Sequence, residues 1–106
     1  MKYEFTGQSK TVKGVKVHQI KRISDGTIGG WIESEKNLDQ KGKCFVYGNA
    51  VVYGNAEVTG NARVYGNASV FGNAVVSGDA EVYGDAIICD DTKVYGYAMI
   101  TGNASL

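Results

Sequence analysis

Apolar residues recur at intervals of six along the second half of the chain. One position in every six is Val, Ile or Leu, and it is occupied by Val46, Val52, Val58, Val64, Val70, Val76, Val82, Ile88, Val94, Ile100 and Leu106. Four residues after each of the first ten lies Ala, except at Thr92. An α-helix turns every 3.6 residues, so a strict period of six with Gly in nearly every unit cannot keep one helical face apolar. The pattern therefore excludes a helix here.

The repeated unit Val-Tyr-Gly-Asn-Ala-x is typical of short strands joined by tight corners. Side chains alternate along a strand, so the Ala and the Val two residues later point the same way, and their neighbours point outward. Gly followed by Asn or Asp tolerates the backbone angles of a sharp bend. Three such sides close a triangular coil of eighteen residues, and coils stack at the strand spacing of roughly 4.8 Å. The sequence thus predicts an all-β protein with a β-solenoid.

The first part of the chain predicts a cap on this solenoid. Residues 2–6 and 15–23 alternate as strands do, with Gly14 near the bend between them. We expect these strands to cover the apolar end of the first coil. The expected division is an N-terminal β cap over 1–27 and a solenoid over 28–106.

The repeat also extends backwards in a degenerate form. Ile28 lies eighteen residues before Val46, and Ile32, Leu38 and Cys44 all fall on the Ala position of the unit. Residues 28–45 are therefore expected to form a first, irregular coil.

These residues resemble the hexapeptide-repeat left-handed parallel β-helix over 46–106. The resemblance implies left-handed coils, since crossovers between parallel strands are otherwise right-handed. The segments GGWIE (29–33), NL (37–38) and GKCFVY (42–47) are similar to the lead-in of small phage and prophage hexapeptide-repeat proteins called polymer-forming. That likeness implies an accessory protein made in an infected bacterial cell, such as an inhibitor of host defence of the anti-CRISPR kind.

One outward face of the predicted coils carries a ladder of aromatic rings. Tyr47, Tyr65 and Tyr83 are spaced by eighteen residues, and Arg63 lies beside them, within reach of Glu81 above. Aromatic ladders stiffen sheets, which is one interpretation. The other is a flat platform for a planar ligand or a partner.

A second outward face carries no charge. Its positions are Val51, Tyr53, Ser69, Phe71, Ile87, Cys89 and Ser105. A contiguous apolar face on a protein surface usually marks an interface. We therefore expect self-association through Val51, Tyr53, Phe71, Ile87 and Cys89, or through the end of the last coil at Leu106, with a two-fold dimer favoured because such a contact closes. The third face is mixed and polar.

Charge is balanced overall but divided between the two halves. The 106 residues carry 11 Lys and Arg against 11 Asp and Glu, which argues against a general nucleic-acid binder. Five cations lie in or between the predicted cap strands, namely Lys10, Lys13, Lys16, Lys21 and Arg22. They could approach a phosphate or an acidic protein. Charged strand residues also serve simply as solvated edges.

The residues give little support for catalysis or metal binding. Acyltransferases that this solenoid resembles use a His in a coil or its loop, whereas the only histidine here is His18 in the predicted cap. The carbonic-anhydrase use of the same fold needs several His ligands, which one His cannot supply. Asp79, Asp85 and Asp91 fall on successive corners and point apart. No enzyme, cofactor or metal site is therefore expected.

The cysteines and hydropathy indicate the compartment. Cys44 is expected to point inward and Cys89 outward, too far apart for a disulfide, which fits a reducing environment. No apolar run is long enough to cross a bilayer. The sequence therefore favours a non-catalytic binding protein in the bacterial cytoplasm, a homo-oligomer with an unidentified protein partner. A structural polymer is the main alternative, and an acyltransferase-like enzyme is the next.

Overall fold

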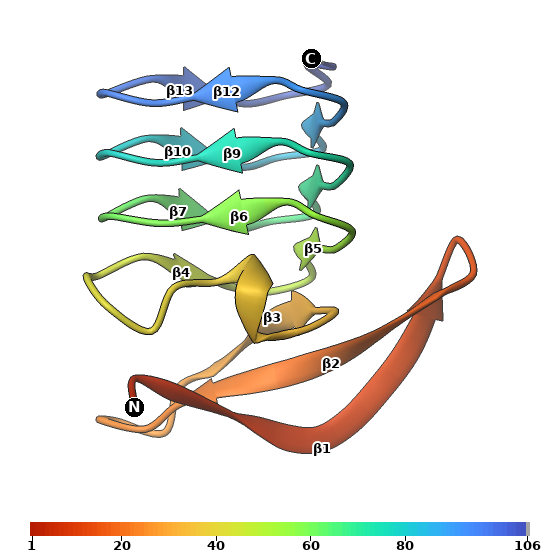
Figure 1. Ribbon diagram of the computed structural model, residues 1–106, viewed down its shortest axis with the longest axis vertical. Helices are drawn as coiled ribbons and strands as arrows, with labels where there is room; N and C mark the ends of the chain where they lie inside the picture. Colours follow the sequence, from red (N-terminus) through yellow and green to blue (C-terminus); the bar gives the residue numbers. More distant parts are fainter. Residues whose placement is uncertain (106) are drawn as a thin grey trace.

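The computed structural model describes residues 1–105, and Leu106, proposed above as an interface residue, lies outside them. Stacked triangular coils form a β-solenoid that is closed at one end by a β-hairpin (Figure 1). The strands of the coils are β4 (Phe45–Val46), β5 (Val51–Val52), β6 (Glu57–Val58), β7 (Arg63–Val64), β8 (Ser69–Val70), β9 (Val75–Val76), β10 (Glu81–Val82), β11 (Ile87–Ile88), β12 (Lys93–Val94) and β13 (Met99–Ile100). The predicted fold class is confirmed.

Three parallel sheets make the sides of the triangle. Strands β4, β7, β10 and β13 stack as the β4 face, β5, β8 and β11 as the β5 face, and β6, β9 and β12 as the β6 face. Val46 pairs with Val64, and Val64 with Val82, so one lap takes eighteen residues. The repeated Val and Ala side chains from Val46 to Ile88 are fully buried between the faces, which removes a continuous apolar column from water.

Tight corners join the sides of each coil. The corner glycines have φ near +65°, a conformation that L-residues with a Cβ adopt at a cost. Asp90 is the one corner residue at this position that is not Gly, with φ 57°. Asp90 therefore adopts a left-handed backbone conformation that Gly would adopt at lower cost.

Replacing Asp90 with Gly should stabilise the protein slightly. The left-handed conformation costs an L-residue about 1–2 kcal/mol, and the extra freedom of Gly in the unfolded chain offsets about 0.5–1 kcal/mol of the gain. We expect a rise of about 0.5 kcal/mol in the free energy of unfolding, measured by urea denaturation. Asp90→Ala is the control and should destabilise, because Ala tolerates this conformation less well than Asp. A loss of stability in Asp90→Gly would contradict the argument.

The first lap is irregular in a way the sequence did not reveal. It runs through β3 (Ile28–Ile32) and a 3₁₀ turn, η1 (Glu35–Asn37). Ile32 pairs with Val52 and Leu38 with Val58, twenty residues apart. Ile32 and Leu38 therefore occupy the Val position of the repeat. The prediction that they occupy the Ala position is wrong, and the register differs by two residues. The extra residues lie in the segment 39–44, which bulges before the regular repeat begins.

The hairpin of the cap joins the coils edge to edge. Strands β1 (Tyr3–Val12) and β2 (Val15–Arg22) are antiparallel, and β2 pairs in turn with β3, which pairs with β5. Two predicted strands are thus confirmed, with β1 longer than expected. Tyr3 and Ile20 enter the main apolar core and cover the first coil, as predicted.

The cap also buries a residue expected at the surface. Phe45 falls on an outward position of the repeat, yet its side chain is fully buried. A Cβ on Gly29 would lie 2.7 Å from the Phe45 ring and 2.9 Å from the Ile20 side chain, so the first lap packs directly onto this ring. Ile28, by contrast, was expected inside and is 54% exposed, because it pairs with Lys21 at the end of the hairpin.

Within residues 1–105, no helix has the length and hydropathy needed to cross a membrane.

Candidate functional site

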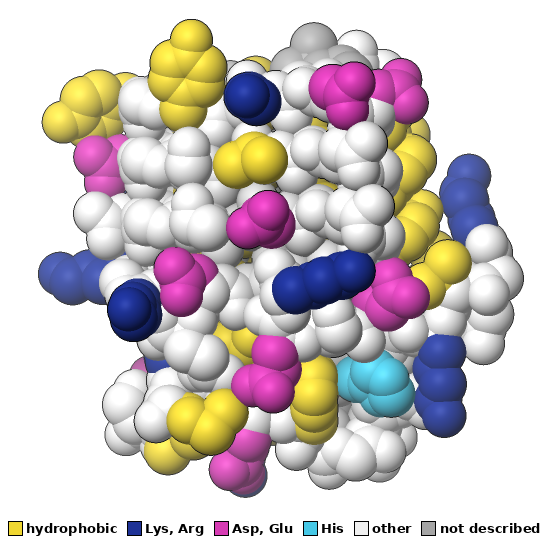
Figure 2. Space-filling view, viewed as in Figure 1, with side chains coloured by type: hydrophobic (Ala, Val, Ile, Leu, Met, Phe, Trp, Pro, Cys, Tyr) yellow, Lys and Arg dark blue, Asp and Glu magenta, His cyan; other side chains and the backbone are white. Residues whose placement is uncertain are grey.

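A pocket lies where the cap meets the first coils, beside the β4 face. Its volume is about 620 Å³. We call it the cap pocket, and it is lined by Lys2, Arg22, Ser24, Gly42, Lys43, Cys44, Phe45, Tyr47, Asn61, Arg63 and Asp79. Basic side chains gather at the left edge of Figure 2, at the level of the loop that leads into β4.

Lys2 is held rigidly at one wall of this pocket. Its Nζ donates to the carbonyl oxygens of Cys44 at 2.6 Å, Lys41 at 3.2 Å and Gly42 at 3.3 Å. The Cys44 Sγ lies 3.2 Å from the same nitrogen. Three carbonyl acceptors satisfy the three donors of an ammonium group. The charge of Lys2 is therefore fixed in place, although no carboxylate among residues 1–105 pairs with it.

Arg22, the last residue of β2, is also held in place at the pocket. It forms a two-armed ion pair with Asp25, with Nε to Oδ1 at 3.1 Å and Nη2 to Oδ2 at 3.0 Å. Hydrogen bonds from Arg22 and from the Thr27 amide and hydroxyl hold the pKa of Asp25 well below its usual range. Nη1 of Arg22 donates to the Tyr47 hydroxyl at 3.1 Å, and its guanidinium lies 5.1 Å from the centre of the Phe45 ring. This arginine fastens the cap to the coils.

Two further cations reach the pocket with more freedom. Lys43 is exposed, and its side chain makes no hydrogen bond or ion pair with residues 1–105. Arg63 is 54% exposed and contacts Glu81 through Nη2 alone, at 3.4 Å. Lys43 and Arg63 therefore have donors available to a ligand.

The aromatic ladder of the β4 face has two rungs instead of three. Tyr65 and Tyr83 stack with ring centres 4.9 Å apart and planes 2° apart, as the spacing predicts. Tyr47 does not join them, because Arg22 binds its hydroxyl and its ring meets Phe45 edge-on at 5.0 Å. Tyr47 thus lies on the β4 face as predicted, but the expected stacking of its ring in the ladder is wrong. Arg63 contacts Glu81, as expected, and the guanidinium of Arg22 lies over the Phe45 ring.

Tyr65, the ring of this stack nearer the cap, is hydrogen-bonded to a carboxylate. The Tyr65 hydroxyl donates to Glu81 Oε1 at 2.8 Å. Burial, followed by this hydrogen bond, raises the pKa of Tyr65 to about 12. The ring is thus fixed as a neutral phenol. Whether the stack binds a planar ligand stays a prediction.

The charge-free β5 face is largely covered by the chain itself. The far end of the β1–β2 hairpin rises beside β5 (Figure 1). Val51 and Tyr53 are only 6% and 7% exposed, and they pack with Val17 of the hairpin. The expectation that Val51 and Tyr53 face solvent is therefore wrong.

The upper part of the β5 face remains open. Tyr53 stacks on Phe71 with ring centres 5.1 Å apart, and Phe71 is half-buried. Ile87 is 40% exposed and Cys89 is half-buried. Phe71, Ile87 and Cys89 remain candidates for an interface.

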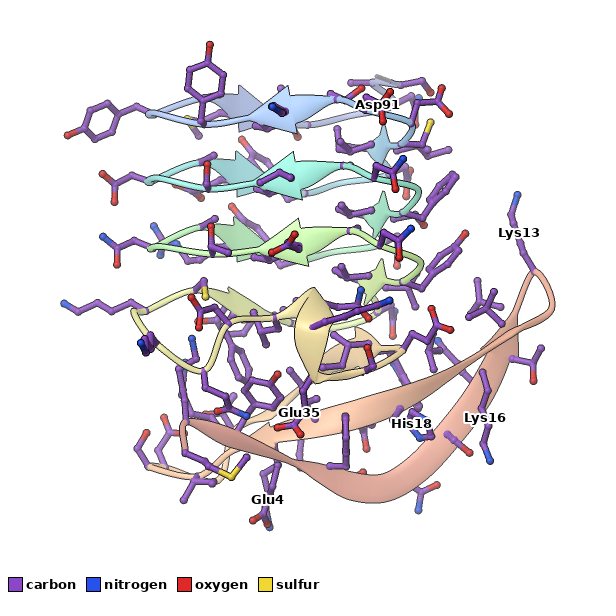
Figure 3. All side chains as sticks on the ribbon, in the orientation of Figure 1. Glu4, Lys13, Lys16, His18, Glu35 and Asp91 are labelled. Carbon is purple, nitrogen blue, oxygen red and sulfur yellow. The ribbon has the colours of Figure 1, made fainter. Side chains whose placement is uncertain are left out.

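The basic residues of the hairpin do not form one site. Lys10 lies 4.4 Å from the centre of the Trp31 ring, Lys21 pairs with Glu4, and Arg22 belongs to the cap pocket. Lys13 at the hairpin tip and Lys16 on β2 project away from the coils (Figure 3). The structure therefore disperses the five cations of the predicted basic head.

The geometry around the only histidine is that of a packed side chain. His18 lies on β2, its ring 5.3 Å from that of Phe5 (Figure 3). It is absent from the lining of the cap pocket. Among residues 1–105 no group of three or more His, Cys, Asp or Glu could hold a metal ion.

The corner carboxylates are engaged one by one with amides of the coil below. Asn61 donates to Asp79 at 3.1 Å, Asn67 to Asp85 at 3.2 Å, and Asn73 to Asp91 at 3.1 Å. These pairs are stacked along three different corners, so the carboxylates do not converge.

Three large apolar side chains stand exposed together on the uppermost corner. Tyr95, Tyr97 and Met99 are 69%, 84% and 60% exposed, and we call them the apolar corner. Hydrophobic side chains gather at the upper left of Figure 2, where β12 leads into β13. At the equivalent positions one coil lower the chain has Ser77, Asp79 and Glu81. The surface thus changes from polar to apolar in a single step.

Sequence reasoning missed both Lys2 and Lys43 of the cap pocket and all of the apolar corner. No periodicity links Lys2 to Lys43, and only the folded cap brings them together. The apolar corner, in contrast, carried a readable signal, because its three residues break the polar pattern of the coils below.

Two comparisons with known proteins agree with the fold. Residues 62–78 match a family model described as the YdcK beta solenoid repeat. The chain is also similar to the protein called "Uncharacterized acetyltransferase YdcK" of Escherichia coli (strain K12), with 43% identity over 53 residues. The aligned part covers 43% of this chain and 16% of that protein, so the chain spans a small part of its relative's length. Both similarities support a β-solenoid repeat protein.

Proposed function

We propose that this protein is a non-catalytic binding module whose coils form a rigid scaffold and whose apolar corner contacts a second copy of the chain. The observation that carries the proposal is the exposure of Tyr95, Tyr97 and Met99, at 69%, 84% and 60%. Large apolar groups displayed together on a protein surface mark interaction sites, and aromatic residues dominate the energetics of such sites. Aromatic residues and Met are also enriched in protein interfaces.

A two-fold dimer would bury this apolar surface on both copies with a single contact. In a two-fold contact the same patch on each copy is buried against its equivalent, and the assembly closes. The resemblance to small phage and prophage proteins suggests that the dimer then binds a host or phage factor. A long filament would instead support the polymer-forming alternative.

The coils supply a variant that tests the dimer without disturbing the fold. Tyr95→Thr, Tyr97→Asn and Met99→Arg together give the last corner the residues found at Thr59, Asn61 and Arg63. We expect wild-type dimers in sedimentation equilibrium and at least a hundredfold weaker association in the triple variant, since each lost anchor is worth about 1–2 kcal/mol.

A matched control addresses the competing face. Ile87→Ser gives β11 the residue found at Ser69, one coil lower, and should leave the dimer intact. A monomeric wild type, or dissociation by Ile87→Ser instead of the triple variant, would overturn the proposal and in the second case identify the β5 face as the interface.

Acetyl transfer is the second candidate, favoured by the name of the E. coli relative. It requires a base, and His18 is the only histidine of the chain. We expect no turnover of an acetyl donor above buffer in an assay that detects thiol release. Turnover by the wild type that His18→Ala abolishes would replace the binding proposal with an enzymatic one.

A further inference from the structure

The cap pocket carries an excess of positive charge. Four of its lining residues are cations, and one, Asp79, is a carboxylate. Arg22 and Arg63 have carboxylate partners just outside the lining, Asp25 and Glu81. One positive charge remains in excess when these two partners are counted. The unmatched cations are Lys2 and Lys43, which have no carboxylate partner within residues 1–105.

The available donors approach from different elements. Lys43 lies on the loop before β4 and is exposed, while Arg63 comes from β7 and uses only Nη2 on Glu81. Behind them, Lys2 and Arg22 are immobilised by the hydrogen bonds described above. Charges already fixed in the free protein lose little entropy when a ligand binds.

We infer that the cap pocket binds the phosphate group of a small-molecule ligand, with Lys43 and Arg63 as direct contacts and Lys2 and Arg22 as fixed charges behind them. A phosphate presents three terminal oxygens in three directions, which suits donors from separate elements. Arginine and lysine together are the usual partners of this group, the first through its planar fork and the second as a point charge.

The size of the pocket indicates more than an inorganic ion. Sites for small molecules typically enclose about 300–1,000 Å³, and the cap pocket at about 620 Å³ lies within this range. Next to the cations are the Tyr47 ring and the polar side chains of Ser24 and Asn61. These groups can contact an organic body attached to the phosphate. The inference does not depend on the proposed dimer.

The test uses methyl phosphate as the probe and acetate as the carboxylate comparison. Both are titrated into the isotope-labelled full chain at constant ionic strength, and backbone amide shifts are followed by NMR. We expect saturable shifts at residues 42–44 and 63 with methyl phosphate, and at least tenfold weaker binding of acetate. Lys43→Gln and Arg63→Gln should each weaken binding of methyl phosphate about tenfold, because each removes a charge-assisted hydrogen bond.

Lys93→Gln is the matched control. It removes the same charge from an exposed lysine on β12, outside the pocket lining, and should leave the affinity unchanged. The amide spectrum of each variant reports whether it is folded. Equal weakening by Lys93→Gln, shifts centred on hairpin residues 10–16, absence of saturation, or acetate binding as tight as that of methyl phosphate would each overturn the inference.

Discussion

Replacing Asn37 with Ala should reduce the free energy of unfolding by about 4 kcal/mol, measured by urea denaturation. Asn37 is fully buried at the end of η1. Its Oδ1 accepts from the amides of Glu33 at 3.0 Å and Ser34 at 2.9 Å. Its Nδ2 donates to the carbonyls of Gly54 at 3.2 Å and Ala56 at 2.8 Å. One side chain thus joins the first lap to the next coil through four backbone groups.

The expected size follows from those four groups. Each buried polar group that loses its partner costs about 1–3 kcal/mol, and some are rescued by water or small shifts. Asn55→Ala is the control, since Asn55 is exposed and its Nδ2 donates to the side-chain Oδ1 of Asn73 in the next coil. This substitution should cost less than about 1 kcal/mol. A loss below about 1 kcal/mol in Asn37→Ala would show that the first lap does not depend on this side chain.

Asn37→Asp should make the free energy of unfolding depend on pH. The carboxylate would face two carbonyl oxygens in a buried site, so its pKa in the folded protein should rise above its unfolded value. The folded state then binds the proton more tightly, and stability relative to wild type is greatest below the unfolded pKa and falls as the pH rises through the folded pKa. The variant should therefore be closest to wild type near pH 4 and weakest at neutral pH.

Gly66→Ala should damage the fold more than Gly96→Ala, which serves as its matched control. Both glycines have positive φ, 69° and 67°, so both variants force Ala into the left-handed region. A Cβ at Gly66 would also lie 2.9 Å from the amide nitrogen of Gly84, whereas at Gly96 it would meet nothing within 4 Å. The pair differs in the contact with the next coil.

We expect a loss of about 1–2 kcal/mol for Gly96→Ala from the backbone alone. Gly66→Ala should lose at least about 3 kcal/mol, because the coils above it must also separate. Thermal and urea unfolding of both variants measure the difference. Equal losses would mean that backbone conformation, and not the close stacking of corners, accounts for the glycine at this position.

The repeated half of the fold could be predicted because its short strands and Gly corners recur without a break. We expected three such sides to make one lap, and the pairing of Val46 with Val64 confirms the lap of eighteen residues. The first lap could not be placed as well. Its corner at η1 is held by Asn37 and not by the Gly-Asn pair of the regular corners. The segment 39–44 also contains two residues more than a regular side, and the repeat pattern gives no sign of them.

The surfaces were harder to predict than the coils. Alternation correctly assigns Val51 and Tyr53 to the outside of the triangle, but it does not say that the hairpin then folds over them. The same hairpin turns Tyr47 away from its ladder through Arg22. Contacts between a cap and a repeat depend on where the chain returns in space, and a periodic pattern holds no information on that path.

Inter-coil bonds connect residues at a nearly constant separation, as from the Asn49 amide to the Gly66 carbonyl and from the Asn67 amide to the Gly84 carbonyl. Closing each new lap therefore carries the same modest entropic penalty as closing the one before it. Duplication or deletion of one whole repeat of three sides would keep the same pattern of backbone hydrogen bonds between adjacent coils. The architecture thus sets no preferred length, and evolution can lengthen or shorten such a protein in steps of one lap while the cap stays as it is.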